Sequence, residues 1–396
     1  MQTNFSASFL ASDKGHRIND ILRKCVHCGF CNATCPTHQV TGNELDGPRG
    51  RIYLIKEALE DQVASNASLQ HIDSCLSCLS CETTCPSGVE YRELIDFGKQ
   101  TLRQRVPRRW WPKTLRRLLC FVFTRPQLFR PIYWFARSLR LTPRITDKAT
   151  FKRTVKTESV EYLILKGCVQ SVAAPSIADT LQQLLDRANI SSQLDVYTHC
   201  CGALEHHNDA EDKALLRIKK NIDHWHEQIE NGCKAIIMTA SGCGAMLQDY
   251  PRLLADDPIY ADKAKRVAAH SLDASEVLSQ LPLRKSRPTL DRIVFHPPCT
   301  LQHAQRLDHH AEQILTRAGY QLQPFADRHL CCGSAGTYSI LHTEMANELR
   351  QNKLDKLEEQ PIELIASANI GCMLHLQNGT KTEVRHWLEL VELDLS

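Results

Sequence analysis

Four cysteines at short, regular intervals occur twice near the start of this chain, and they constrain its fold more than any other feature. The first run is Cys25, Cys28, Cys31 and Cys35, followed by Pro36, and the second is Cys75, Cys78, Cys81 and Cys85, followed by Pro86. The pattern C-x2-C-x2-C-x3-C-P is typical of loops that hold iron–sulfur clusters through thiolates. The sequence therefore predicts two [4Fe–4S] clusters.

The spacing also predicts which cysteines share a cluster. In two-cluster proteins with this pattern, the fourth cysteine of each run ligates the other cluster. We therefore expect a first set of Cys25, Cys28, Cys31 and Cys85, and a second set of Cys75, Cys78, Cys81 and Cys35. Zinc or disulfides are the alternative, because C-x2-C is also zinc-ligand spacing. The third cysteine at the same step and the proline after the fourth, both repeated, favour clusters.

Composition places the chain among ordinary globular proteins and favours a reducing compartment. It has 396 residues, 42% of them hydrophobic, and 18 cysteines. The first residues form no apolar signal sequence, and no stretch approaches the roughly 18 apolar residues of a membrane-spanning helix. We therefore expect a cytoplasmic or peripheral protein whose cysteines bind metal.

A basic, aromatic segment follows the cysteine runs. Residues 101–153 hold 15 Lys or Arg against one acidic residue, Asp147, and include Trp110, Trp111 and Trp134. This composition is typical of a helix that lies on an anionic bilayer. A solvated linker and a docking site for a partner subunit are the alternatives. Nucleic acid is not expected, because no base-reading motif accompanies the charge.

The region around the cysteine runs is expected to be mainly helical. Residues 49–60 place Ile52, Ile55 and Leu59 at helical spacing, so a helix should connect the two runs. The preceding residues 46–50 contain turn-forming residues, with Gly47 and Gly50 expected at positive φ.

A second cysteine pattern is repeated in the remainder of the chain. Its copies are Cys168, Cys200, Cys201 and Cys243, and then Cys299, Cys331, Cys332 and Cys372. The copies are offset by 131, 131, 131 and 129 residues, and a glycine follows each vicinal pair. Strand-like runs precede the first and last cysteine of each copy, and helical patterns at 208–230 and 300–318 lie between them. Each copy therefore reads as an α/β unit with its cysteines near strand ends, and the two units are expected to pack as a pseudo-symmetric pair.

The role of these eight cysteines is open at this point. Vicinal cysteines beside glycine can ligate a metal cluster, form a redox-active disulfide or remain as small buried residues of an ancestral site. Repetition at matched spacing favours an additional redox centre. Cys120 and Cys233 are interpreted as packing residues.

The expected fold class is α+β with several domains: a mainly helical, two-cluster ferredoxin-type domain followed by a duplicated α/β cysteine-rich domain. The expected boundaries are 1–100 for the ferredoxin-type domain, 101–157 for the basic aromatic segment, 158–290 for the first repeat and 291–396 for the second.

The cysteine-rich repeats resemble the CCG domains of the heterodisulfide reductase and glycolate oxidase families. With the ferredoxin-type pair in front, the chain resembles the iron–sulfur subunits of bacterial glycolate oxidase over nearly its full length. The similar stretches are CVHCGFCNATCPT at 25–37, DGPRGRIYLIK at 46–56, CETTCPSG at 81–88, TASGCGA at 239–245, CTLQHAQ at 299–305 and HLCCGSAGTY at 329–338.

The resemblance implies an electron-transfer subunit. Flavin subunits carrying FAD would oxidise glycolate to glyoxylate, and this chain would pass the electrons toward a respiratory quinone at the inner face of the inner membrane. The chain has no G-x-G-x-x-G fingerprint after a strand, so neither a catalytic residue nor oxidation of substrate by this chain alone is expected. His296 and His303, near Cys299, are interpreted as ordinary core or surface residues.

Two alternatives remain. One is the iron–sulfur subunit of anaerobic glycerol-3-phosphate dehydrogenase, which shares both modules. The other is a self-standing enzyme similar to heterodisulfide reductase that acts at the CCG crevice. The second is weakened by Ala240 and Asn369, which stand where those relatives have an additional cysteine in each repeat.

Overall fold

The computed structural model describes residues 1–60, 64–108, 110–139, 141–143, 145, 160–198, 200–283, 292–307 and 309–393. They divide into two compact units, which are described separately. The first contains residues 1–114 and 329–353, and the second contains residues 115–328 and 354–396. The end of the expected basic segment, 146–157, and the first residues expected for the first repeat, 158 and 159, lie outside the described residues.

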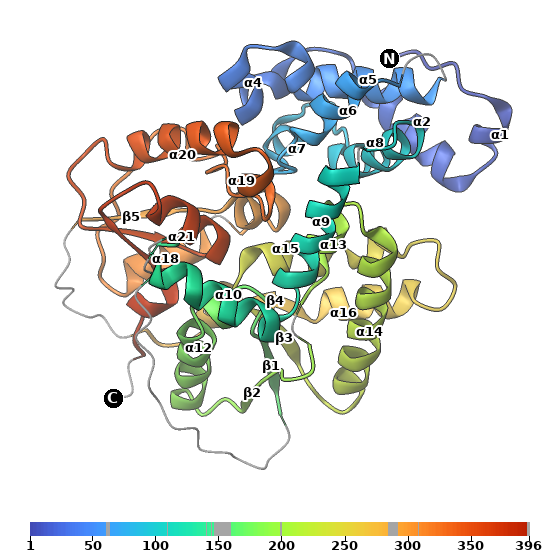
Figure 1. The fold of residues 1–396 in the computed structure, drawn as a ribbon. Coiled ribbons are helices and arrows are strands. Elements are labelled where there is room, and N and C mark those ends of the chain that lie inside the picture. Colours follow the sequence, from blue (N-terminus) through green and yellow to red (C-terminus); the bar gives the residue numbers. More distant parts are fainter. Residues whose placement is uncertain are drawn as a thin grey trace. The chain divides into compact units, whose positions relative to one another are not determined.

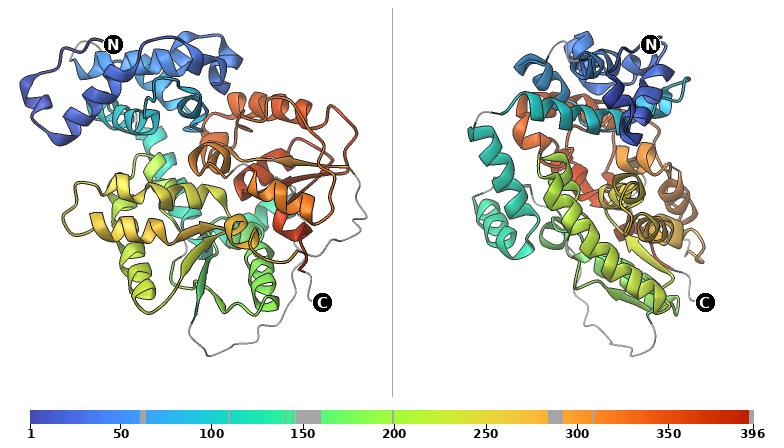
Figure 2. Two further views of the ribbon diagram at one scale, coloured as in Figure 1. Left: turned by 180° about the vertical axis from the view of Figure 1, so that it is seen from behind. Right: turned by 90° about the vertical axis from the view of Figure 1, so that its right-hand side faces the viewer.

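The first unit is helical, and its described residues contain no strand. Its N-terminal part is blue to cyan in Figures 1 and 2. The helices are α1 (Ala7–Leu10), α2 (Asp13–Lys24), α3 (Phe30–Ala33), α4 (Pro36–Thr41), η1 (Glu44–Asp46), α5 (Pro48–Leu59), α6 (Asn66–Asp73), α7 (Ser80–Thr84), α8 (Tyr91–Arg105), α19 (Tyr338–Leu341) and most of α20 (Thr343–Leu357). Helix α9 (Trp110–Phe123) crosses the boundary between the units.

Helices α5 and α8 form the centre of the first unit. The expected helix over 49–60 is confirmed as α5, which buries Ile52, Ile55 and Leu59. These side chains share one apolar cluster with Leu94 and other residues of α8. A Cβ atom at Gly98 of α8 would collide with Ile55, so this glycine permits the close approach of the two helices. Helix α5 lies between the two cysteine runs, and α8 follows the second run.

The glycines before α5 do not have the expected positive φ. Gly47 has a φ of −94°, and Gly50 lies inside α5. Both positions are crowded instead. A Cβ atom at Gly47 would lie 2.7 Å from Asn32 Oδ1, and one at Gly50 would collide with the backbone oxygen of Glu44. Space, rather than backbone conformation, requires glycine here.

The second unit contains two parallel sheets. One has the order β2-β1-β3-β4 and the other β5-β6-β7. The strands are β1 (Tyr162–Leu165), β2 (Ser192–Leu194), β3 (Ala235–Met238), β4 (Ser271–Asp273), β5 (Ile293–His296), β6 (Leu364–Ser367) and β7 (Glu383–His386). Strands β1, β3, β5 and β6 confirm the runs expected before the first and last cysteine of each repeat. The helical N-terminal domain and the duplicated α/β part confirm the expected fold class.

Helices cover both faces of the first sheet. Leu163 and Leu165 of β1 and Ile236 of β3 share a core with α14 and α15. The intervening Ile164 is fully buried and points to the other face, because side chains alternate along a strand. Figure 1 shows α12 and α14 on opposite sides of β1 to β4. Cys168 and Cys243 follow the carboxyl ends of β1 and β3, at one edge of this sheet.

The remaining helices of the second unit lie mainly between its strands. They are α10 (Pro126–Ser138), α11 (Gln170–Ala173), α12 (Ser176–Arg187), α13 (Ala203–His207), α14 (Glu211–Glu230), α15 (Ser241–Leu253), α16 (Ala261–Ala269), α17 (Ala274–Leu278), η2 (Thr300–Ala304), α18 (His310–Arg317), α21 (Ile370–Gln377) and η3 (Trp387–Leu390). No helix among the described residues is long and apolar enough to span a bilayer.

Of the two helices expected between the cysteines, one is confirmed and one is interrupted. Helix α14 confirms the first. The second, expected over 300–318, divides into the π-helical turn η2 and the helix α18. Gln305, directly after η2, donates from Nε2 to the oxygens of Ser241 at 3.0 Å and Thr300 at 3.3 Å. This contact joins the end of the turn to the first repeat.

The two repeats contact each other at the residues that follow β3 and β6. The Ser241 N–H donates to the Ala368 oxygen at 3.1 Å, and the Ser241 and Thr300 hydroxyls are 2.8 Å apart. His386, at the end of β7, donates from Nε2 to the Thr239 oxygen at 2.9 Å. Matched ends of the two sheets therefore form the joint between the repeats.

Candidate metal centres

The first set of cysteines lines a single cavity. Cys25 and Cys28 reach it from the loop after α2, Cys31 from α3, and Cys85 from the end of α7. Cys28 is exposed, Cys31 and Cys85 are half-buried, and Cys25 is buried. Thus three thiols of the first run and the fourth thiol of the second run lie around one space, which Cys81 of the second set also lines.

Repeated left-handed residues curve the two cysteine loops in the same way. His27 and Gly29 have φ values of 56° and 84°, and Ser77 and Leu79, at the same places in the second run, have values of 53° and 64°. Left-handed residues beside right-handed ones turn successive backbone N–H groups inward and form concavities that suit anions. The curvature brings cysteines three residues apart toward a common centre.

The electrostatics of the first set reflect its crowding. Burial, together with the negative charges of Cys25, Cys85 and Cys28, raises the pKa of the Cys31 thiol to about 11. Four such thiols cannot all ionise near neutral pH unless a cation offsets their repulsion. The donor set therefore fits a positively charged metal centre.

The second set converges in the same manner but is more deeply buried. Burial and then the charges of Cys78, Cys75 and Cys35 raise the pKa of the Cys81 thiol well above its usual value. Cys75 differs. Burial acts to raise its pKa, but the charges of Arg51 and Lys99 outweigh that effect and lower it.

Two buried cations distinguish the second set. Arg51 of α5 is 1% exposed, and its Nη1 lies 3.8 Å from Cys35 Sγ. Lys99 of α8 is 7% exposed and donates to the Cys75 oxygen and to Ser77 Oγ, at 3.4 and 3.0 Å. Burial lowers the pKa of Lys99. Four thiolates beside buried cations are a suitable environment for a [4Fe–4S] cluster, which carries net negative charge with its ligands.

Sequence reasoning did not single out Arg51 or Lys99. A signal was present in the sequence, because each residue lies one helical turn from a buried isoleucine on the same helix face. Arg51 precedes Ile55 by four residues, and Lys99 follows Ile95 by four. A charged residue in phase with buried aliphatic residues has to meet a counter-charge or hydrogen-bond partners.

The thiols of the first repeat form another compact group. Cys168 follows β1, Cys200 and Cys201 precede α13, and Cys243 lies in the first turn of α15. Hydrogen bonds from the thiols of Cys168 and Cys201, and then from the Gly202 N–H at 3.4 Å, lower the pKa of Cys200 well below its usual value. The Cys201 thiol also forms a hydrogen bond with the Cys243 thiol.

A buried polar framework holds the vicinal pair in the first repeat. Asn221 of α14 donates from Nδ2 to the Cys200 oxygen at 3.0 Å and to the Tyr250 hydroxyl at 3.2 Å. Tyr250 of α15 donates to the Cys201 oxygen at 2.8 Å. These two side chains fix the backbone of both cysteines, and neither was singled out from the sequence.

The corresponding thiols of the second repeat are divided between the two units. Cys299, directly before η2, and Cys372, in α21, belong to the second unit. Cys331 and Cys332 belong to the first unit, where Tyr338 donates to the Ser74 oxygen at 3.0 Å. Burial and the charge of Cys75 raise the pKa of Tyr338, and Cys331 also contributes to the rise.

The cysteines and the histidine that the sequence analysis interpreted as packing or core residues lie buried and form hydrogen bonds within the fold. Cys120 and Cys233 are buried and donate to the backbone oxygens of Leu204 and Ala235, at 3.3 and 3.4 Å. His296 is 1% exposed, and its Nδ1 lies 3.1 Å from Ser367 Oγ of the neighbouring strand. Asn369, where a cysteine was noted as missing, accepts from the Gly371 N–H at 3.1 Å and caps α21.

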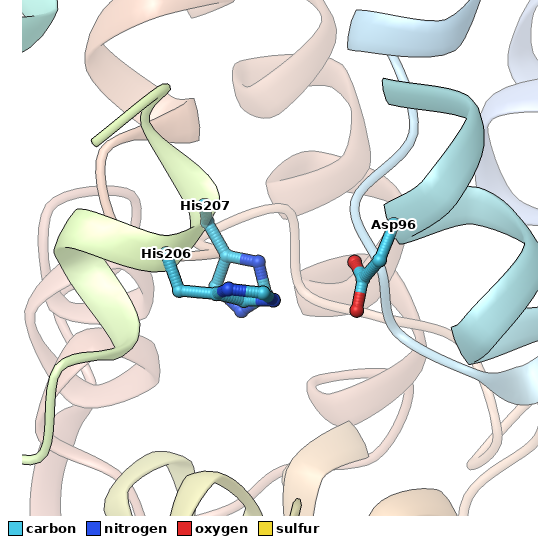
Figure 3. Close-up of side chains that lie close together, drawn as sticks. All are labelled: Asp96, His206 and His207. Carbon is cyan, nitrogen blue, oxygen red and sulfur yellow. The ribbon is translucent and has the colours of Figure 1, made fainter. Parts of the chain in front are cut away.

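Two adjacent histidines project from α13. The rings of His206 and His207 have centroids 5.1 Å apart (Figure 3). They directly follow Glu205, which forms a two-point ion pair with Arg217 at 2.6 and 2.8 Å. Asp96, also drawn in Figure 3, belongs to α8 of the first unit.

Comparison with known proteins bears on the identity of these centres. Residues 21–89 match the 4Fe-4S dicluster domain, and residues 162–248 and 293–377 match the cysteine-rich domain CCG. The glycolate oxidase iron-sulfur subunit of Escherichia coli (strain K12) is 43% identical over 99% of this chain and 98% of its own length. The chain belongs to the family of glycolate oxidase iron–sulfur subunits. It is an iron–sulfur oxidoreductase subunit.

More distant relatives match either nearly the whole chain or only part of it. The probable glycolate oxidase iron-sulfur subunit of Bacillus subtilis (strain 168) is 26% identical over 94% of this chain and 90% of its own length. Lactate utilization protein A of Halalkalibacterium halodurans is 22% identical over 57% of this chain and 93% of its own length. The full-length similarities therefore include both the ferredoxin-type part and the cysteine-rich part.

Proposed function

We propose that this chain transfers electrons within a complex that oxidises glycolate to glyoxylate. The observation that carries the proposal is that the two cysteine runs curve in the same way within one helical unit and that thiols of both runs line one cavity. It is supported by the 43% identity to a glycolate oxidase iron–sulfur subunit, which favours glycolate over glycerol 3-phosphate as the substrate of the complex. Family membership also favours a subunit over a self-standing enzyme.

The two sets would each hold one [4Fe–4S] cluster. The first would bind to Cys25, Cys28, Cys31 and Cys85, and the second to Cys75, Cys78, Cys81 and Cys35. When bound, the clusters supply one-electron redox chemistry. The chain itself orients the thiolates, buries one set and provides the cations beside it.

Glycolate oxidation itself would take place on partner subunits that carry FAD. This chain would accept their electrons and deliver them to a respiratory quinone. Purified alone, it should not oxidise glycolate, and its clusters should be reduced by glycolate only when the flavin subunits are added.

Iron and acid-labile sulfide analysis tests the cluster assignment. Anaerobically purified protein should contain at least about eight irons, four for each of the two clusters. Cys31→Ser and Cys78→Ser should each perturb one cluster and lower the iron content, whereas Cys120→Ser, a buried thiol outside all the sets, should retain it. Unchanged iron in both ligand variants would reject the assignment. Glycolate-dependent bleaching without flavin subunits would reject the relay role.

We also propose an additional redox centre in the cysteine-rich repeats. Cys168, Cys200, Cys201 and Cys243 supply four thiols in mutual contact, and Cys299, Cys331, Cys332 and Cys372 are their counterparts. About twelve irons in the wild type, falling in a Cys201→Ser/Cys332→Ser variant, would support this centre. Eight irons in both proteins would leave the repeats with a structural role.

Membrane association is proposed on the basis of helix α10. Leu128, Ile132, Phe135 and Leu139 form a stripe at helical spacing and are 40%, 50%, 68% and 54% exposed. The opposite residues Phe129 and Tyr133 are buried, so the stripe is not required for the core. An apolar stripe of this kind beside arginines suits the surface of an anionic bilayer at the inner face of the inner membrane.

Arginines lie against the exposed aromatic rings of this region. The Arg125 guanidinium is 4.1 Å from the ring centroid of Phe121, and that of Arg137 is 5.1 Å from the ring centroid of Trp134. Such pairs place positive charge at the level of lipid phosphates while the rings enter the interface.

Vesicle sedimentation separates lipid binding from the alternatives. The protein should bind to phosphatidylglycerol vesicles, more weakly at high salt, and Ile132→Ser/Phe135→Ser should weaken that binding. Leu216→Ser, a 58% exposed leucine on α14, is the matched control. If the double variant retains vesicle binding but loses the flavin subunits, the stripe is a subunit dock instead.

A further inference from the structure

The Arg51 guanidinium is fixed in place beside the second set of thiols. Its Nε donates to the His71 oxygen at 2.8 Å, and its Nη2 donates to Thr37 Oγ1 at 3.0 Å and to Ser74 Oγ at 2.8 Å. Its Nη1 points at Cys35 Sγ, 3.8 Å away. The side chain is 1% exposed, so neither rotation nor water displaces this charge.

The charge of Arg51 is only loosely paired. Asp46 Oδ1 lies 3.8 Å from Arg51 Nη2, and the same oxygen is engaged at 2.9 Å by both His71 Nδ1 and Ser74 Oγ. Arg49, two residues earlier on α5, provides the contrast. Its Nε and Nη2 donate to the two oxygens of Glu44 at 2.6 and 3.0 Å, and its side chain is 36% exposed. A close ion pair and solvent therefore offset the charge nearest the first set.

Hydrogen bonds to sulfur show the same asymmetry. In the second set, Cys35 Sγ faces Arg51, and Cys75 Sγ faces the Tyr91 hydroxyl at 3.8 Å and the Ser77 N–H at 3.4 Å. Among the residues that the structure describes, no side-chain donor reaches a sulfur of the first set. Hydrogen bonds to the sulfurs and local net charge are two of the factors that set the potential of a cluster.

Reduction of a cluster adds one electron and therefore one negative charge, with no bond made or broken. A fixed cation and donors to sulfur stabilise that charge and raise the reduction potential. Water near the partly exposed first set acts in the same direction for that cluster, but the high dielectric of water weakens each interaction. A full charge fixed within 4 Å of a ligand sulfur in the interior is not weakened in this way.

We propose that Arg51 holds the second cluster at a higher reduction potential than the first, so that electrons pass from the first cluster to the second. The inference rests on the proposed function, because it requires both clusters to be present. It also agrees with exposure. Cys28 is exposed at the first set, together with Val26 and Phe30 at 67% and 63%, so the cluster of lower potential is the one that a partner subunit can approach.

Anaerobic redox titration followed by EPR tests the proposal. Arg51→Gln keeps a hydrogen-bond donor but removes the charge, and Arg51→Lys keeps the charge. In Arg51→Gln the equilibrium constant for electron transfer from the first cluster to the second should fall at least tenfold, which is about 59 mV for one electron. Arg51→Lys should recover most of the difference. Arg49→Gln is the matched control and should leave the second cluster unchanged.

Two further variants keep the test decisive. Cys28→Ser identifies the wave that belongs to the first cluster. Tyr91→Phe removes one hydroxyl donor with little change in volume, and it should lower the potential of the second cluster by less than Arg51→Gln. If Arg51→Gln does not fold, Arg51→Met, which also removes the charge, takes its place in the titration.

The outcomes separate the inference from the function on which it rests. Equal potentials of the second cluster in wild type and Arg51→Gln, with the same iron content in both, would overturn the inference alone. An equal shift in Arg49→Gln would do the same. Absence of the two clusters from the wild type would instead overturn the proposed function.

Discussion

The ferredoxin-type loops and the first cysteine-rich repeat both gather four thiols, but they do so by different means. In the loops, left-handed residues such as His27 and Leu79 curve the backbone around a centre, and Arg51 supplies charge. In the first repeat, the thiols form hydrogen bonds with one another, and Asn221 and Tyr250 donate to the backbone oxygens of Cys200 and Cys201. The cysteines of the loops are therefore brought together by backbone curvature, whereas those of the repeat are held by side chains of neighbouring helices.

Removal of metal should give the largest difference between these regions. Chelation under oxidising conditions should abolish amide protection in the loops 25–35 and 75–85, because removal of the clusters frees the cysteines that keep these loops curved. Strands β1 and β3 and helix α14 should keep their protection. Hydrogen exchange of the holo and metal-free proteins measures this. Simultaneous loss in both regions would mean that the repeat, too, depends on a bound centre.

The protein framework of the repeat can be weakened without touching a thiol. Tyr250→Phe leaves the buried Cys201 oxygen without its donor, which should cost about 1–3 kcal/mol in unfolding free energy. Denaturant unfolding of the cysteine-rich part provides the measurement. Tyr197→Phe, at a side chain 78% exposed, is the control and should change little. Equal effects from the two substitutions would remove Tyr250 from the framework.

The joint between the two repeats should make the α/β part sensitive to acid. Burial lowers the pKa of His386 to about 3, while its Nε2 donates to the Thr239 oxygen and its Nδ1 accepts from the Leu388 N–H at 3.3 Å. Below pH 6.5 the unfolded chain binds a proton that the folded chain does not bind. Stability is therefore complete above pH 6.5 and falls toward pH 3, by about 2 kcal/mol at pH 5.

His386→Gln should flatten this pH dependence. Thermal unfolding between pH 5 and pH 8 measures it, with His270→Gln, at the half-buried residue that ends α16, as the control. A His386→Gln protein with the slope of the wild type would assign the acid sensitivity to other groups.

The smallest effect is expected at the edge of the first sheet. Lys234 and Glu161 form an ion pair at 2.5 Å with side chains 60% and 34% exposed. Solvent screens such a pair, so Lys234→Ala should leave the unfolding free energy nearly unchanged. Denaturant unfolding at low and high salt checks this. A larger loss would show that the sheet edge contributes more than the buried framework predicts.

Much of the architecture followed from local pattern. The helix α5 and the strands before the cysteines were predictable because buried aliphatic residues recur with helical or strand spacing. The turn at η2 was not, because the polar contact of Gln305 with Ser241 joins residues 64 positions apart. Gly47 and Gly50 were identified as special, but the reason is crowding from Asn32 and Glu44, which sequence order does not reveal.

The sequence by itself determined the thiol chemistry, the duplication and the membership of the chain in its family, because ligand spacing and repeat offsets are local properties of the chain. Only the tertiary structure decided which groups surround those thiols. The side chains that contact the cysteines come from 16 to 49 residues away in the sequence, and their burial depends on helix packing. They are Arg51, Lys99, Asn221 and Tyr250. A charge or a hydrogen bond acts through space, so its effect on a redox centre is set by the fold.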